Sequence, residues 1–136
     1  MKLTRIEKAG QPIVTASGEC LYELIGAAAL LGDARNQSLA CSVIPPGKYS
    51  APHYHKLSEE TLYILEGSGR MIVDGQVFEM NVGDALLVEP GEVHSIYNDS
   101  KSIDLKQLAI SSPPWKASDA FPVQGSANSI NIESAN

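Results

Sequence analysis

The chain has 136 residues and a mass of 14.5 kDa, which is the size of one ordinary domain. Hydrophobic residues make up 43% and charged residues 19%, so there is enough apolar material for a core and too little charge for a disordered chain. The net charge is −6. An acidic chain without a basic stripe cannot neutralise a phosphate backbone, which argues against nucleic acid as a partner.

We expect the sequence to lack a signal for export or for membrane insertion. Residues 1–8 are charged where a secretion signal would need an apolar run. The longest apolar stretch, residues 24–31, is far shorter than the roughly 20 residues of a membrane span. We therefore expect a cytoplasmic protein that does not contact membranes.

Short strands are expected along most of the chain. The N-terminal third predicts strands at 13–15 and 21–25, joined to the rest by a small-residue connection at 26–32. From residue 38 onward, short apolar and β-branched runs alternate with turn residues, and no helical period is sustained. The expected strands there are 38–44, 61–65, 69–73, 76–80, 85–88, 94–98 and 103–110. This pattern is typical of an all-β sandwich or barrel.

Three segments follow from this pattern. Residues 1–37 hold the N-terminal strands and connection, 38–112 the barrel core, and 113–136 a C-terminal segment with a polar tail. Asp74-Gly75 predicts a hairpin with a two-residue loop between its flanking strands. The tail from 125 to 136 is expected to be a frayed end or an arm ordered against a partner chain.

All three histidines of the chain fall into one pattern. His53 and His55 are two residues apart, so on an extended strand both rings point to the same face. Glu60 follows five residues later, and His94 opens another strand after a turn. Two neighbouring strands of a barrel would thus direct three imidazoles and one carboxylate inward. This donor set, without thiolate, suits Fe, Mn, Ni, Cu or Zn.

Such a ligand set would leave coordination positions open for water, oxygen or a substrate, as in a reactive metal site. The alternative is that each histidine is a hydrogen-bonded residue of the barrel interior. The metal interpretation is favoured because no histidine of the chain lies outside the pattern.

Two segments resemble the motifs of the cupin family. Residues 47–67, GKYSAPHYHKLSEETLYILEG, are similar to the first motif, G-x5-H-x-H-x4-E-x6-G. Residues 83–98, GDALLVEPGEVHSIYN, are similar to the second, G-x5-P-x-G-x2-H-x3-N. Glu89 departs from the pattern because it stands where the family has its first proline, at a turn position and not at a ligand position.

The resemblance implies a single-domain cupin, a double-stranded β-helix or jelly-roll barrel of the kind often labelled mannose-6-phosphate isomerase-like or RmlC-like. It also implies one divalent transition metal per chain, held by His53, His55, Glu60 and His94. Glu60 is preferred over Glu59, because a strand face that includes residues 60, 62 and 64 points Glu59 outward.

The same alternation predicts a mainly apolar pocket around the metal. Inward positions on the strands near the ligands, and on the neighbouring hairpin, are Leu62, Ile64, Met71, Val73, Ile96 and Asn98. The polar candidates for substrate contact are Tyr49, Tyr63, Arg70 and Gln107.

The leading functional hypothesis is a mononuclear metal enzyme acting on a small organic molecule inside the barrel, by a dioxygenase or oxidative-cleavage reaction. Two alternatives stay open: a sugar or enol isomerase or lyase, and a small-molecule (sugar) binding module without turnover. Few acid or base groups are expected in the pocket, which favours the module. We also expect a homodimer, because the apolar segments at 13–14 and 21–31 need a surface to cover them.

Overall fold

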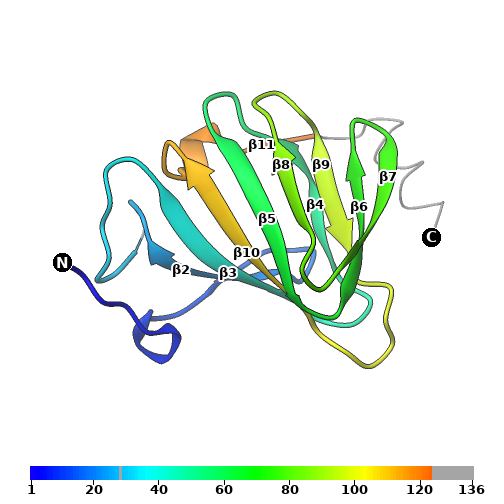
Figure 1. The fold of residues 1–136 in the computed structure, drawn as a ribbon, viewed down its shortest axis with the longest axis horizontal. Helices are drawn as coiled ribbons and strands as arrows, with labels where there is room; N and C mark the ends of the chain where they lie inside the picture. The colour runs from blue at the N-terminus through cyan, green and yellow to red at the C-terminus, as the bar shows by residue number, and fades with distance from the viewer. Residues whose placement is uncertain (28, 124–136) are drawn as a thin grey trace.

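The computed structural model describes residues 1–27 and 29–123, and it confirms the all-β fold class (Figure 1). Short 3-10 helices lie at Ile6–Lys8 and Ala117–Asp119. The strands are β1 (Ile13–Val14), β2 (Cys20–Ile25), β3 (Ser38–Ile44), β4 (Tyr49–Tyr54), β5 (Glu59–Glu66), β6 (Ser68–Val73), β7 (Gln76–Asn81), β8 (Ala85–Val88), β9 (His94–Tyr97), β10 (Leu105–Ser112) and β11 (Phe121–Pro122).

The strands form two antiparallel sheets that face each other. Sheet A has the order β1-β2-β3-β10-β5-β8, and sheet B has the order β11-β4-β9-β6-β7. Figure 1 shows β3, β10 and β5 crossing one side of the barrel, with β4, β9 and β6 on the other side. This is the double-sheet jelly-roll arrangement, and the space between the sheets is the barrel interior.

Alternation along the strands fills this interior. On β5, residues 60, 62 and 64 are buried, and the residues between them are exposed or half-buried. Burial of apolar side chains from both sheets is the main driving force for joining them. The buried core cluster is Ile44, Leu62, Ile64, Met71, Val73, Met80, Val88, Ile96 and Leu105.

The predicted hairpin is present between β6 and β7. Val73 pairs with Gln76, and the two loop residues have φ angles of 46° (Asp74) and 83° (Gly75). Positive φ at both positions gives the turn twist that matches a β-hairpin, and glycine adopts it without steric cost.

The structure differs from the expected strands at three places. β4 and β11 were not among the predicted runs, and β10 extends from Leu105 to Ser112 instead of covering 103–110. Residues 98–103 form a loop because the side-chain amide of Asn98 donates hydrogen bonds to the carbonyl oxygens of Ile44 and Ile103, both at 2.8 Å. The predicted tail at 125–136 lies outside the described residues. Within the described ranges, no helix is both long and apolar enough to cross a bilayer.

Asp119 holds the loop between β4 and β5 in place. Its carboxylate accepts hydrogen bonds from the backbone N–H groups of Lys56, Leu57 and Ser58, at 2.9 to 3.2 Å. Its backbone oxygen accepts a hydrogen bond from Nδ1 of His55 at 2.8 Å. Burial alone would raise the pKa of this carboxyl, but the three backbone donors outweigh it and the pKa is lowered. The C-terminal segment therefore fixes the loop that joins two of the expected metal ligands.

We predict that Asp119→Ala lowers the free energy of unfolding by about 1–3 kcal/mol, because three backbone donors, of which that of Ser58 is buried, lose their acceptor. Asp119→Asn keeps one carbonyl oxygen and should cost less. Folding lowers the pKa below the ordinary 3.8. The stabilisation by the carboxylate should therefore be complete above pH 3.8 and lost as the pH falls through the lowered pKa. Chemical denaturation at several pH values measures both effects.

Asp99→Ala is the matched control. Asp99 pairs with Arg70 on the surface, and its side chain is exposed. Exposed ion pairs contribute about 0–1 kcal/mol. Equal losses of stability for the alanine variants at positions 99 and 119 would contradict the role given to Asp119.

Candidate metal centre

The three histidines meet at one end of the barrel. His53 on β4 pairs directly with His94 on β9, and their ring centroids are 4.3 Å apart. His55 lies one residue beyond the end of β4. One ring nitrogen from each histidine lies within 4.8 Å of the other two. Cross-strand pairing and the two-residue repeat of a strand thus bring the three rings together.

Backbone carbonyls determine how each ring is oriented. Nδ1 of His53, His55 and His94 lies 2.7, 2.8 and 3.0 Å from the carbonyl oxygens of Ala51, Asp119 and Glu92, respectively. A carbonyl oxygen only accepts hydrogen bonds, so each Nδ1 carries a proton and donates it. Each Nε2 is therefore the nitrogen available to a metal, and this backbone support is typical of metal-binding histidines.

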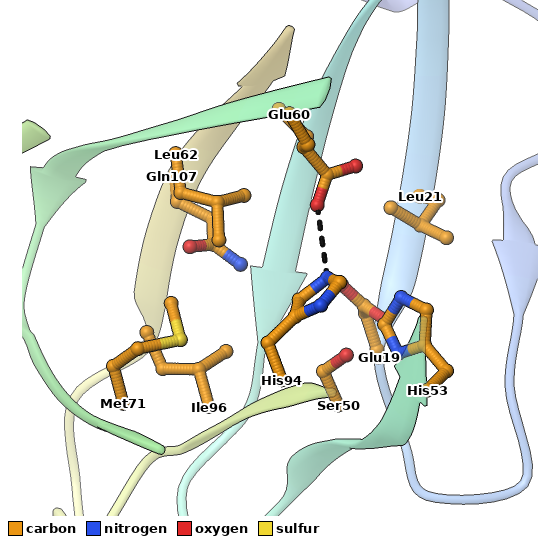
Figure 2. A pocket seen from close by; sticks show the side chains of 11 residues that line it. Glu19, Leu21, Ser50, His53, Glu60, Leu62, Met71, His94, Ile96 and Gln107 are labelled. Atoms are coloured by element: carbon orange, nitrogen blue, oxygen red, sulfur yellow. Dashed lines mark hydrogen bonds and ion pairs between the residues drawn. The ribbon is translucent and has the colours of Figure 1, made fainter. Parts of the chain in front are cut away.

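Glu60 faces the histidines from the opposite sheet. It lies on β5 of sheet A and is only 7% exposed, whereas Glu59 is exposed. Its Oε1 lies 3.2 Å from Nε2 of His94, and its Oε2 lies 3.8 Å from Nε2 of His55. The hydroxyl of Ser111 on the neighbouring strand β10 donates a hydrogen bond to Oε2 at 3.2 Å. Figure 2 shows the carboxylate directed at His94.

This donor set fits a divalent cation. Nε2 of His55 is buried and has no hydrogen-bond partner among the described residues. A buried polar atom normally has a partner, and a metal ion would supply one here. Nε2 of His94 faces a carboxylate oxygen, an arrangement that needs either a proton or a shared cation between the two atoms. Imidazole nitrogens with one carboxylate oxygen suit the transition metals expected from the sequence.

Burial and neighbouring charges shift the pKa values of His53, His94 and Glu60. Burial, together with the charge of His94, lowers the pKa of His53 to about 4. Burial would also lower the pKa of His94, but the hydrogen bond and the charge of Glu60 outweigh it and raise that pKa. Burial would raise the pKa of Glu60, but His94, His55 and His53 together lower it. Glu60 is therefore ionised, and His53 is neutral near pH 7, as metal ligands must be.

His53, His94 and Glu60 border a small cavity of about 50 Å³. Its apolar lining comes from Leu21, Leu62, Met71, Ile96 and Ala109. Its polar lining comes from Glu19, Ser50 and Gln107, beside His53, Glu60 and His94 (Figure 2). Apolar walls with a few directed polar groups are typical of small-molecule sites.

Four of the pocket residues expected from the sequence line this cavity: Leu62, Met71, Ile96 and Gln107. Ile64 and Val73 instead lie in the packed core. Asn98 is buried and bonds backbone carbonyls near the loop at 98–103, which is a structural role.

The structure does not bring Tyr49, Tyr63 and Arg70 into the cavity. Each is one residue away from an inward position on its strand, and neighbouring residues on a strand face opposite sides. Tyr49 stacks on Tyr97 at 5.0 Å, and Tyr63 is 39% exposed. Arg70 lies over the Tyr97 ring and forms its ion pair at the surface.

Sequence reasoning missed Glu19, Leu21, Ser50 and Ala109, of which Glu19 matters most. It lies just before β2, is only 8% exposed, and accepts a hydrogen bond from the Ser42 hydroxyl at 2.6 Å. Burial raises the pKa of its carboxyl, against hydrogen bonds from Ser42 and Ser50 that lower it. The alternation of Glu19, Leu21 and Glu23 was the only signal for this inward face.

Known proteins share this sequence and architecture. A sequence profile of the Cupin domain family matches residues 41–111. An uncharacterized protein of Methanocaldococcus jannaschii is 37% identical over 109 residues, covering 80% of this chain and 85% of that protein. Quercetin 2,3-dioxygenase of Bacillus subtilis is 34% identical over 111 residues, or 73% of this chain. The chain spans only 31% of the length of that dioxygenase.

A solved structure with the same fold is that of the polyketide cyclase RemF from Streptomyces resistomycificus. It has a TM-score of 0.73 and 22% sequence identity, and the match covers 98% of this chain and 93% of that one. The profile match covers both histidine-bearing strands and Glu60. The chain belongs to the cupin domain family.

Proposed function

We propose that the protein is a mononuclear metal enzyme that acts on a small organic molecule in the barrel cavity, by oxidative cleavage of the dioxygenase type. The observation that carries this proposal is the convergence of three Nε2 atoms and one carboxylate beside a cavity that His53, His94 and Glu60 border. A purely structural site would be closed by its ligands, whereas a reactive site needs space next to the metal.

His53, His55, Glu60 and His94 would hold one divalent ion per chain, of Fe, Mn, Ni, Cu or Zn. When bound, such an ion supplies Lewis acidity and, if it is redox-active, a route for electrons between the substrate and O₂. Leu62, Met71 and Ile96 would bind the apolar part of the substrate and exclude water. The backbone carbonyls that fix the imidazole rings would preserve the ligand geometry during turnover.

The similarity to the Bacillus subtilis quercetin 2,3-dioxygenase supports oxygen chemistry, although this chain corresponds to less than a third of that protein. A reaction without oxidation, such as an isomerisation or a lyase reaction, is the second candidate. It is favoured by Glu19, because a second buried carboxyl in the cavity offers the proton transfer that such reactions need.

We predict that the protein binds one zinc or cobalt ion per chain, and that the double variant His53→Ala/His94→Ala does not. Glu60→Gln should weaken metal binding about 10- to 100-fold, because it removes the only anionic ligand. Elemental analysis and competition with a chelator measure stoichiometry and affinity. Bound metal should also raise the melting temperature.

Glu59→Gln is the control, because Glu59 is the exposed neighbour of Glu60. It should change the metal affinity less than about twofold. Full metal retention in the double histidine variant, or equal losses for the Glu59 and Glu60 variants, would contradict the assigned ligands.

We predict that at least one metal form converts a compound from a panel of enols, catechols, flavonols and keto-sugars, with uptake of O₂. Oxygen consumption and product mass are the measurements, with the iron, manganese, nickel and copper forms compared. Conversion without O₂ uptake would replace the oxidative proposal by an isomerase or lyase. Micromolar binding without any conversion would replace the enzyme by a binding module.

We further propose that the protein is a homodimer. Both residues of β1, at the edge of sheet A, are exposed and apolar, as are Leu30 and Leu31. Light scattering at micromolar concentration should give about twice the chain mass of 14.5 kDa. A mass of 14.5 kDa would contradict the proposal.

A further inference from the structure

The cavity contains a second buried carboxyl group that the metal site does not use. Glu19 and Glu60 both line it, but Glu60 enters from β5 of sheet A and Glu19 from the residue just before β2. Glu60 is paired with histidines, whereas the hydrogen-bond partners of Glu19 are serines. Burying a carboxyl group in an apolar barrel costs free energy unless the group is well hydrogen-bonded or paired with a charge. A second buried carboxyl group therefore suggests a functional role.

Ser42 and Ser50 fix the orientation of Glu19. Ser42 is fully buried and donates its hydroxyl proton to Oε2 of Glu19, while the amide nitrogen of Gln107 lies 3.4 Å from the Ser42 oxygen. Because Gln107 donates to Ser42, the Ser42 proton is directed at Glu19. Ser50 forms a second hydrogen bond to the same carboxyl. This network joins β3 and β10 of sheet A with β4 of sheet B and holds the carboxyl at the cavity wall.

The two serines do not saturate this carboxyl. A carboxylate offers about four acceptor positions on its two oxygens, and the hydroxyls of Ser42 and Ser50 occupy two of them. Figure 2 shows Glu19 behind His53 and His94, above Ser50, on the side of the cavity where the histidines lie. A molecule that reaches the histidine cluster through the cavity would therefore meet Glu19 as well.

We propose that the two carboxyl groups have different tasks: Glu60 binds the metal, and Glu19 binds a hydroxyl group of the substrate. The inference rests on the proposed function, because it assumes that the substrate occupies this cavity. The corresponding substrate class is a small, mainly apolar molecule with two neighbouring oxygen atoms. One oxygen would lie at the metal site and the other, as a hydroxyl, would donate a hydrogen bond to Glu19. Leu62, Met71 and Ile96 would contact its apolar part.

The first arm of the test compares the same substitution at both carboxyls. Glu19→Gln should leave the zinc affinity within about threefold of the wild-type value, whereas Glu60→Gln should lower it about 10- to 100-fold. Competition with a chelator measures both affinities. Equal losses would mean that Glu19 is itself a metal ligand, and this would overturn the division of tasks.

The second arm measures recognition of a hydroxyl group with the zinc-loaded protein, so that no turnover is needed. The probes are catechol and 2-methoxyphenol, which differ in that one hydroxyl is replaced by a methoxy group that cannot donate. Calorimetry gives the ratio of their dissociation constants. The dissociation constant of 2-methoxyphenol divided by that of catechol should be at least about tenfold larger in the wild-type protein than in Glu19→Met. The reason is that the variant loses the hydrogen bond from the catechol hydroxyl to the charged carboxyl group.

Glu19→Gln should give an intermediate ratio, since its amide oxygen still accepts a hydrogen bond, and it replaces Glu19→Met if that variant does not fold. Glu59→Gln is the control, because Glu59 is exposed, does not line the cavity and should keep the wild-type ratio. The same ratio in the wild-type protein and the Glu19 variants, or binding of neither probe to the wild-type protein, would overturn the proposal. Failure of the proposed enzyme function would instead appear only as absence of turnover, with the binding ratio unchanged.

Discussion

Hydrogen bonds from three imidazole Nδ1–H groups to backbone carbonyl oxygens determine the chemistry of the barrel. They commit the Nδ1 proton of each ring to the backbone, so the Nε2 atoms are the ring nitrogens left to face Glu60 and a metal. The acceptors come from three different parts of the chain: β4, the turn before β9, and the 3-10 helix at Ala117–Asp119. The ligand geometry therefore depends on the whole barrel and on a C-terminal segment beyond the region 41–111 that matches the family.

Charge balance explains why so many ionisable groups tolerate burial between two apolar sheets. Glu60 is offset by the histidines around it, and a divalent ion would complete that balance. Glu19 is stabilised differently, by hydroxyl donors instead of charges, which leaves its carboxyl less acidic. The two environments shift the pKa values of two chemically identical side chains in opposite directions. Such a separation is the usual basis for assigning different roles to two carboxyls in one site.

The ligand set was predictable from the sequence because it depends on local rules. His53 and His55 share a face through the two-residue repeat of an extended strand, and Glu60 follows from the same repeat on β5. The hairpin at Asp74-Gly75 was also predictable, because its turn depends only on these two loop residues. For the same reason, Leu62, Met71 and Ile96 could be placed on the inner face.

The residues that were missed depend on long-range pairing or on irregular backbone. Glu19 lies just before β2, and its place in the cavity depends on the pairing of β2 with β3, which the local alternation of Glu19, Leu21 and Glu23 does not specify. Ser50 lies three residues before His53, and the two face the same cavity only because the β4–β9 register shifts between them. Asp119 contacts His55 across 64 residues of sequence. Tyr63 and Arg70 were named for their polarity, although alternation alone directs them outward.

The most direct test of the central claim is X-ray absorption spectroscopy at the metal edge of the cobalt- or zinc-loaded protein. Imidazole rings give a characteristic multiple-scattering signal, so the number of histidine ligands can be counted. We expect three imidazole nitrogens and at least one oxygen donor, with the imidazole count falling to two in His55→Ala. A spectrum with fewer than two imidazoles, or one that is unchanged in His55→Ala, would contradict a metal site built from these three histidines.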